Sequence, residues 1–280
     1  MINLSYIIPF YQGQDTIQYM LESIYRIDLS LDEFEVIVVD DCSPIPAETV
    51  LANSRETWPN LKIVRHQQNK RQGGAKNTGI RQAKGEYIAF ADQDDIVISS
   101  NVKEALFIGI QAHADMVSCH FQIKSAIDVT TRGVGTQNLE VSGTEFCEKL
   151  FDSSVSLAPW SYLYRRDFLI NVNHPYTENV LMEDSDWVAW HLIHVKSICV
   201  FPKCIYEWRM NEESITHSYH YTHKIDFLKM GCRKIKDSSK YGYLSESFSN
   251  VMKSDGYYNI IGVTQTLWRV DNYFITLINH

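Results

Sequence analysis

Three carboxylates stand close together in the sequence, directly after a short apolar segment. The segment GEYIAFADQDD ends with Asp92, Asp94 and Asp95. Two like charges about 4 Å apart repel each other by roughly 4 kcal/mol at an effective dielectric constant of about 20. A turn needs one aspartate rather than three, so we expect a cation here, although turn formation and helix capping alone remain the alternative. A hard divalent cation, Mg²⁺ or Mn²⁺, takes one or two carboxylates together with water and phosphate oxygens.

The elements that would position these carboxylates alternate between strands and helices. Apolar runs predict strands, and apolar residues at helical spacing predict helices. The predicted strands are 4–8, 34–39, 61–65, 86–91 and 115–121, and the predicted helices are 17–27, 74–83 and 99–113. Buried strands that alternate with helices are typical of an α/β fold with a mostly parallel, Rossmann-like sheet flanked by helices. Ligands of such sheets bind beyond the carboxyl ends of the strands, which places the segments PFYQ, DDCSP and DQDD at one edge.

The composition argues against several classes of function. The 280 residues carry a net charge of -8, whereas nucleic-acid binders show a basic balance or stripe, so we expect no nucleic-acid partner. No apolar run approaches the ~18 residues of a membrane span, and the N-terminus lacks the features of a signal peptide, so we expect a cytoplasmic protein. The cysteines form no Cys-x-x-Cys pair, which favours reduced thiols. Neither a dinucleotide-binding glycine motif nor a P-loop is present, which argues against nicotinamide-dependent dehydrogenases and P-loop NTPases.

Six segments of the sequence occur together, in this order, in one enzyme family. They are SYIIPFYQGQDTIQYMLESI, VIVVDDCSP, NKRQGGAKNTGIRQAKGEYIAFADQDD, PWSYLYRRDFL, LMEDSDW and YEWRMNEESITHS. Their order and spacing resemble family 2 glycosyltransferases with the GT-A fold, over about residues 3–220. The resemblance implies a catalytic domain over 1–220, with a nucleotide-binding half (1–120) and an acceptor-binding half (121–220), and a helical C-terminal extension over 221–280. It also implies an inverting, metal-dependent enzyme of the hexosyltransferase type that uses a nucleotide sugar, commonly a UDP-sugar.

The resemblance assigns donor-binding roles to residues of the first half. Pro9 and Tyr11 match the pocket of the nucleotide base, where the Tyr11 ring would stack on uracil. Asp41 matches the residue that would accept the N3–H of the base. Lys76 stands where the family usually has an arginine that contacts the donor, and a lysine keeps the charge but loses the planar fork. Asp92 would lie near the ribose and the sugar.

The resemblance also implies the metal site. Asp94 would hold Mn²⁺ or Mg²⁺ against the diphosphate, with Asp95 beside it. Arg209, Ser214 and His217 match a loop that closes over the diphosphate, and His217 is counted with the metal ligands. A solvated loop or helix face is the other interpretation of the histidine-rich segment HSYHYTH.

The catalytic base implied by the resemblance is Asp184, in the segment EDSDW. Removal of a proton from the attacking sugar hydroxyl by such a carboxylate contributes ~10²–10⁴-fold to the rate. One direct displacement inverts the anomeric centre. The same acidic cluster is also what the first turn of a helix favours, because the helix dipole attracts negative charge there.

The acceptor and the partners follow less directly. The resemblance implies a saccharide or lipid-linked saccharide as acceptor, as in the synthesis of cell-surface polysaccharides. Residues 222–240 carry an apolar helical stripe with lysines around it. This stripe either packs on its own domain or rests on the inner face of a membrane as a peripheral contact. The apolar C-terminus either covers the catalytic domain, joins a second copy in a homodimer, or continues into further residues.

Two other functions stay open at this point. A sugar-phosphate nucleotidyltransferase uses the same metal and diphosphate chemistry, but it releases pyrophosphate and needs no base at Asp184. A non-catalytic nucleotide-binding protein would need neither the metal aspartates nor the base, and the presence of both argues against it.

Overall fold

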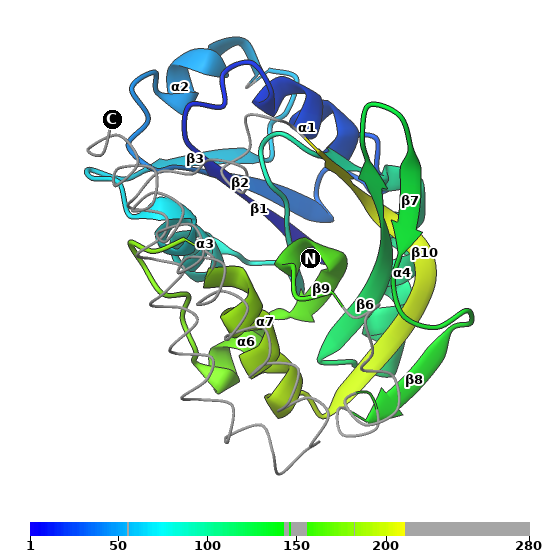
Figure 1. The fold of residues 1–280 in the computed structure, drawn as a ribbon. Coiled ribbons are helices and arrows are strands. Elements are labelled where there is room, and N and C mark those ends of the chain that lie inside the picture. The colour runs from blue at the N-terminus through cyan, green and yellow to red at the C-terminus, as the bar shows by residue number, and fades with distance from the viewer. Residues whose placement is uncertain (55, 143–145, 147–155, 182, 211–280) are drawn as a thin grey trace, which may run out of the picture. The chain divides into compact units, whose positions relative to one another are not determined.

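The computed structural model describes residues 1–54, 56–142, 146, 156–181 and 183–210. These residues form one 10-stranded mixed sheet in the order β3-β2-β1-β4-β9-β6-β10-β5, with β7 beside β6 and β8 beside β10, flanked by helices (Figure 1). The strands are β1 (Leu4–Phe10), β2 (Phe34–Asp40), β3 (Leu61–Arg65), β4 (Tyr87–Phe90), β5 (Ile96–Val97), β6 (Met116–Lys124), β7 (Val129–Arg132), β8 (Leu139–Ser142), β9 (Tyr162–Arg165) and β10 (Ser197–Arg209). The helices are α1 (Ile17–Ile24), α2 (Ala47–Val50), α3 (Arg71–Gln82), α4 (Ser99–Ala112), α6 (Arg166–Val172) and α7 (Glu183–His194).

The first half of the sheet confirms the predicted α/β pattern. Strands β1 to β4 are all parallel, and β1 lies between β2 and β4. The chain therefore moves from β1 outward to β3 and then returns through α3 to the other side of β1. A ligand crevice is expected where the direction of winding reverses, beyond the carboxyl ends of β1 and β4. Tyr11 and the acidic turn Asp92–Asp95 begin at these two ends.

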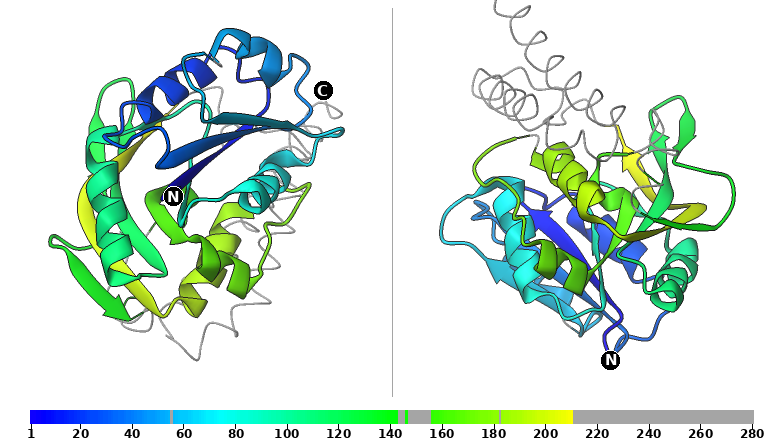
Figure 2. Two further views of the ribbon diagram at one scale, coloured as in Figure 1. Left: turned by 180° about the vertical axis from the view of Figure 1, so that it is seen from behind. Right: turned by 90° about the horizontal axis from the view of Figure 1, so that it is seen from below.

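The alternation of side chains along β1 determines which helix covers which face. Tyr6, Ile8 and Phe10 join the same buried cluster as the apolar residues of α1, because successive side chains of a strand point to opposite faces. Ile7 points to the other face, where a Cβ at Gly79 of α3 would lie 2.2 Å from Ile7 Cγ2. Helices α1 and α2 accordingly lie on one side of β1 to β3, and α3 lies on the other (Figures 1 and 2). The glycine lets α3 approach β1 closely.

The second half of the sheet contains strands that the sequence did not predict. Strand β9 lies antiparallel between β4 and β6, and β10 runs parallel to β6 with register shifts near its middle. Helix α4 packs on β6 and β10, and the sheet curls around toward α6 and α7 (Figure 2). The short strand β5 pairs with β10 directly after the acidic turn. This pairing brings the end of β10 next to the carboxylates.

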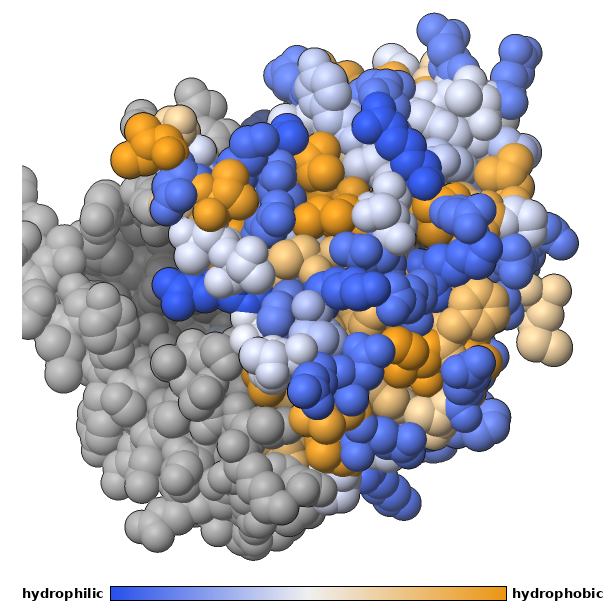
Figure 3. Space-filling view, turned by 90° about the vertical axis from the view of Figure 1, so that its right-hand side faces the viewer, coloured by the Kyte–Doolittle hydropathy of each residue, from blue (hydrophilic) through white to orange (hydrophobic). Residues whose placement is uncertain are grey.

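On the face of this half that Figure 3 shows, the described residues form no large continuous apolar patch. Figure 3 views the molecule from the side of β7 and β10, and its described residues show apolar groups scattered among polar ones. Scattered apolar residues are normal on a protein surface, whereas a large continuous patch marks an interaction site. Among the helices of the described residues, none is both long and apolar enough to cross a membrane.

Several expectations concern residues outside the described ranges. Ser214, His217, the apolar stripe at 222–240 and the proposed division of the chain at residue 220 all stay predictions.

Candidate active site

One carboxylate of the acidic turn is fully used by the fold. Asp95 is 3% exposed, and its two oxygens accept hydrogen bonds at 2.8 Å, Oδ2 from Tyr206 Oη and Oδ1 from the Arg209 backbone N–H. Tyr206 Oη also accepts a hydrogen bond from the Asp92 N–H at 2.9 Å. Burial and the neighbouring Asp92 raise the pKa of Asp95. Asp95, which the sequence places beside the metal, therefore ties the turn to β10.

The side chain of Asp94 differs from that of Asp95 in both exposure and hydrogen bonding. Its side chain is exposed, and no other described residue donates a hydrogen bond or forms an ion pair with its carboxylate. No group of three or more His, Cys, Asp or Glu side chains within the described ranges is arranged to hold a metal by itself. Mg²⁺ and Mn²⁺ do not require such a group, because one or two carboxylates, water and substrate phosphates complete their coordination. The Asp94 carboxylate fits that role.

Gln93 fixes the acidic turn to the end of β1. Its side-chain amide donates a hydrogen bond to Tyr11 O at 2.9 Å and accepts one from the Tyr11 N–H at 3.0 Å. The Tyr11 side chain is 43% exposed, so its ring is available at the rim of the sheet. Pro9, which the sequence places in the same pocket, is a buried residue of β1. Sequence reasoning missed Gln93, because its role depends on the closeness of two strand ends.

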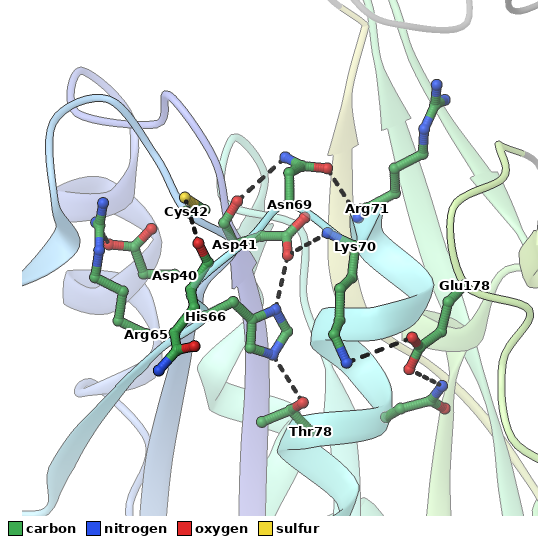
Figure 4. A network of polar contacts seen from close by, with 12 residues as sticks. Asp40, Asp41, Cys42, Arg65, His66, Asn69, Lys70, Arg71, Thr78 and Glu178 are labelled. Atoms are coloured by element: carbon green, nitrogen blue, oxygen red, sulfur yellow. Dashed lines mark hydrogen bonds and ion pairs between the residues drawn. The ribbon is translucent and has the colours of Figure 1, made fainter.

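Asp41 follows β2 and lies at the same edge of the sheet (Figure 4). Its N–H donates to Phe10 O at 2.9 Å. Its Oδ1 accepts hydrogen bonds from His66 Nδ1 at 2.7 Å and from the Lys70 N–H at 2.8 Å. No described residue donates a hydrogen bond to Oδ2. The fold therefore holds Asp41 by Oδ1, and within the described residues Oδ2 remains without a hydrogen bond.

Lys76 connects α3 to the first turn of α7. Its side chain is 1% exposed, and its Nζ lies 2.5 Å from Asp184 Oδ1 and 3.3 Å from Glu183 Oε1. The ammonium also lies 5.3 Å from the centre of the Tyr176 ring. Burial lowers the pKa of Lys76, but the carboxylates of Asp184 and Glu183 outweigh burial and raise it, so the side chain is charged. The resemblance assigns Lys76 to donor binding, whereas in the structure its ammonium forms ion pairs with Glu183 and Asp184 of α7.

The motif GGAKN attaches α3 to the segment before α7. A Cβ at Gly73 would lie 2.4 Å from Thr177 O, which requires a glycine there. Asn77 Nδ2 donates to Tyr176 O at 3.0 Å, and Asn77 Oδ1 accepts from the Tyr176 N–H at 2.8 Å. The Tyr176 ring stacks on Trp187 of α7, with ring centroids 4.2 Å apart. The motif thus fixes α7 relative to the edge that carries Asp41 and Asp94.

Asp184 retains one open oxygen in the acidic first turn of α7. Its side chain is 28% exposed, and no described residue donates a hydrogen bond to Oδ2. Glu183 is 4% exposed, and burial together with Asp184 raises the pKa of Glu183 to about 7. Burial also raises the pKa of Asp92, whose charge interacts with Lys76 and Asp184. The Lys76 ammonium therefore interacts with the carboxylates of Asp184, Glu183 and Asp92.

The raised pKa of Glu183 predicts a pH dependence of stability. Between the ordinary value of 4.5 and about 7, the folded state binds the proton more tightly than the unfolded state, so the free energy of unfolding falls as the pH rises. The variant Glu183→Gln lacks this titration. We therefore expect the free energy of unfolding of Glu183→Gln, relative to that of wild type, to be roughly 1–3 kcal/mol higher at pH 8 than at pH 4.5. Urea denaturation at both pH values measures this, and a stability difference that does not change with pH would contradict it.

The remaining predicted donor residues lie at or beyond the end of the described chain. Arg209 closes β10 with an exposed side chain, and its Nε donates to Glu207 Oε1 at 3.0 Å. Its backbone, rather than its guanidinium, contacts the acidic turn.

The chain matches the family model "Glycosyl transferase family 2" over residues 5–171. EpsJ of Bacillus subtilis, named as an uncharacterized glycosyltransferase, is 27% identical over 218 residues, which cover 76% of this chain and 62% of EpsJ. TarS of Staphylococcus aureus, a poly(ribitol-phosphate) beta-N-acetylglucosaminyltransferase, is 32% identical over 118 residues, which cover 42% of this chain and 20% of TarS. The matched part is less than two thirds of the length of each of these relatives.

Two solved structures share the fold. The crystal structure of TarS 1-349 in complex with UDP-GlcNAc aligns with a TM-score of 0.69 and 22% identity, covering 92% of this chain and 72% of that chain. The mannosyltransferase PcManGT from Pyrobaculum calidifontis, in complex with GDP-Man and Mn²⁺, aligns with a TM-score of 0.57 and 14% identity, covering 98% of this chain and 80% of that chain. These likenesses confirm the predicted GT-A fold. The match of the family model over more than half of the sequence leads to the conclusion that the chain belongs to glycosyl transferase family 2.

Proposed function

We propose that the chain is an inverting glycosyltransferase that moves a sugar from a UDP-sugar to a hydroxyl of a saccharide or lipid-linked saccharide. The observation that carries this proposal is the set of carboxylates with unused oxygens. Among the described residues, none donates to Oδ2 of Asp41 or of Asp184, and none pairs with the exposed carboxylate of Asp94. Unused acceptors at the ligand-binding edge of an α/β sheet suit a base, a metal and an acceptor hydroxyl.

The chemistry of Asp41 supports a uridine nucleotide. An ionised carboxylate only accepts hydrogen bonds, and uracil offers a donor at N3–H where cytosine has a lone pair. We expect CDP to bind more weakly than UDP by ~2–4 kcal/mol, or roughly 30- to 1000-fold. The Tyr11 ring does not discriminate, since every base has a π-face. The relative TarS was solved in complex with UDP-GlcNAc and with UDP.

The first turn of α7 supplies the base for the transfer. Lys76 fixes Oδ1 of Asp184, so Oδ2 is the oxygen that takes the proton from the acceptor hydroxyl. The hydroxyl oxygen attacks the anomeric carbon while the bond to UDP breaks, and this single displacement inverts the anomeric centre. A divalent cation, when bound at Asp94, supplies Lewis-acid compensation for the charge that develops on the diphosphate.

The relatives support the class of acceptor. TarS is named for transfer to poly(ribitol-phosphate), and the product in its name is β-linked. Inversion of an α-linked donor gives a β-linked product. We therefore expect a cell-surface polymer or its lipid-linked precursor as the acceptor.

The test is to incubate the protein with individual UDP-sugars, Mn²⁺ or Mg²⁺, and a panel of saccharide and lipid-linked acceptors. We expect free UDP to appear with one donor, to depend on the cation, and to increase with the correct acceptor. EDTA provides the control. Release of pyrophosphate from a nucleoside triphosphate and a sugar phosphate would instead identify a nucleotidyltransferase. Binding of UDP without turnover of any donor would indicate a nucleotide-binding protein.

A further inference from the structure

His66 directly follows β3, and its ring lies between Asp41 and Thr78 (Figure 4). Its Nδ1 lies 2.7 Å from Asp41 Oδ1, and its Nε2 lies 2.8 Å from Thr78 Oγ1 on α3. The His66 side chain is 9% exposed and that of Asp41 is 4% exposed. This histidine belongs to none of the sequence motifs, so no pattern singles it out.

The direction of each hydrogen bond in this chain follows from the chemistry of the groups. A carboxylate only accepts, so the proton between His66 and Asp41 is on Nδ1. An arginine only donates, and Arg81 NH2 lies 2.8 Å from Thr78 Oγ1. The Thr78 oxygen therefore accepts from Arg81, and its own hydroxyl proton is free to point at His66 Nε2. Thr78 thereby fixes the orientation of the imidazole ring.

The second contact to Asp41 comes from the backbone, also on Oδ1. The Lys70 N–H donates to this oxygen at 2.8 Å, and Asn69 Nδ2 holds the Asp41 carbonyl at 3.1 Å. Both donors to the carboxylate thus meet the same oxygen. Within the described part of the chain, these two donors fix the rotation of the carboxylate about its last bond and leave Oδ2 for a ligand.

We propose that His66 is a positioning residue for base selectivity, which holds Oδ1 of Asp41 so that Oδ2 meets the N3–H of uracil. This inference rests on the proposed UDP-sugar donor. His66 does not touch the nucleotide, and it acts through Asp41. Without the imidazole donor, the Lys70 N–H alone holds Oδ1, so the carboxylate rotates more easily and the direction of Oδ2 is less strictly fixed.

Two amide variants separate the two ring nitrogens. In His66→Asn the side-chain amide stands near the former Nδ1 and can still donate to Asp41, whereas in His66→Gln it reaches toward the former Nε2 and Thr78. We expect His66→Asn to keep the UDP-over-CDP ratio of affinities within about threefold of wild type, because it keeps the hydrogen bond. We expect His66→Gln to lower the ratio by roughly 10- to 100-fold, which is the loss of one charge-assisted hydrogen bond.

The measurement is calorimetric titration with UDP and with CDP in Mn²⁺, together with the melting temperature of each variant. A merely structural role would lower the melting temperature but leave the ratio unchanged. The double variant Asp41→Asn, His66→Gln provides the control, since a residue that acts through Asp41 causes no further change once the carboxylate is gone.

The outcomes distinguish this inference from the proposed function. A wild-type protein that binds UDP and CDP equally overturns the uridine donor and this inference with it. A selective wild type whose His66→Gln variant is equally selective overturns the role of His66 alone. A His66→Gln effect that persists in the Asp41→Asn background also overturns it.

Discussion

Replacing Asp184 by asparagine is expected to lower sugar transfer by ~10²–10⁴-fold, the contribution of a general base. The amide has nearly the shape of the carboxylate but cannot take a proton from the acceptor hydroxyl. Asp184 belongs to α7, whereas Asp41 and Asp94 follow strands β2 and β4, so the affinity for UDP in Mn²⁺ is expected to stay within about threefold. The loss should appear in kcat, because the interaction is made only in the transition state.

Glu183→Gln is the matched control for this variant. It changes the adjacent carboxylate, which lies 3.3 Å from the same Lys76 ammonium, and it leaves the open Oδ2 of Asp184 in place. We expect a smaller loss of transfer than in Asp184→Asn. Melting temperatures show whether either variant disturbs the buried cluster. If transfer survives in Asp184→Asn and is lost in Glu183→Gln, the base is Glu183.

The first half of the fold was predictable from the sequence, and its physical reason is visible in the structure. Strands β1, β2 and β4 are buried on both faces, and such strands read as continuous apolar runs between helices. The helical periodicity of α1 and α4 was equally clear. The carboxyl ends of parallel strands necessarily meet at one edge, so the general location of the site followed from the pattern.

The strands of the second half were not predictable in the same way. Strand β9 is only four residues long and joins β4 to β6, across long stretches of chain. Its partners depend on tertiary packing, for which a local pattern carries no signal. The attachment of α3 to α7 through Asn77 and Lys76 depends on such long-range pairing as well.

The same limit applies to two neighbouring aspartates of the acidic turn. Asp94 and Asp95 are chemically identical in the sequence, yet one is exposed and unpaired among the described residues, and the other is 3% exposed and bound to β10. The difference arises from Tyr206 and the Arg209 backbone, more than a hundred residues away along the chain. The sequence motif assigns both aspartates to the metal, and it carries no signal that Asp95 instead binds β10.

This division predicts opposite results for the same substitution at the two positions. Asp94→Ala removes the carboxylate that fits the cation, so the Mn²⁺-dependent part of the UDP affinity is expected to fall by at least ~100-fold, since loss of a mere supporting contact to a metal ligand already costs 10- to 100-fold. The melting temperature should remain near that of wild type, because the side chain is exposed and forms no hydrogen bond or ion pair with a described residue.

Asp95→Ala is expected to act on stability instead. It leaves the buried Tyr206 hydroxyl and the Arg209 N–H without their acceptor, at a cost of about 1–3 kcal/mol in the free energy of unfolding. Urea denaturation of both variants without metal, and calorimetric titration of both with UDP with and without Mn²⁺, separate the two effects. Because Asp95 has no open oxygen, a partly loosened turn in Asp95→Ala should still show a Mn²⁺-dependent gain in UDP affinity, whereas Asp94→Ala should show none. If Asp95→Ala abolishes that gain at unchanged stability, Asp95 rather than Asp94 holds the metal, and its contacts with β10 must open when the donor binds.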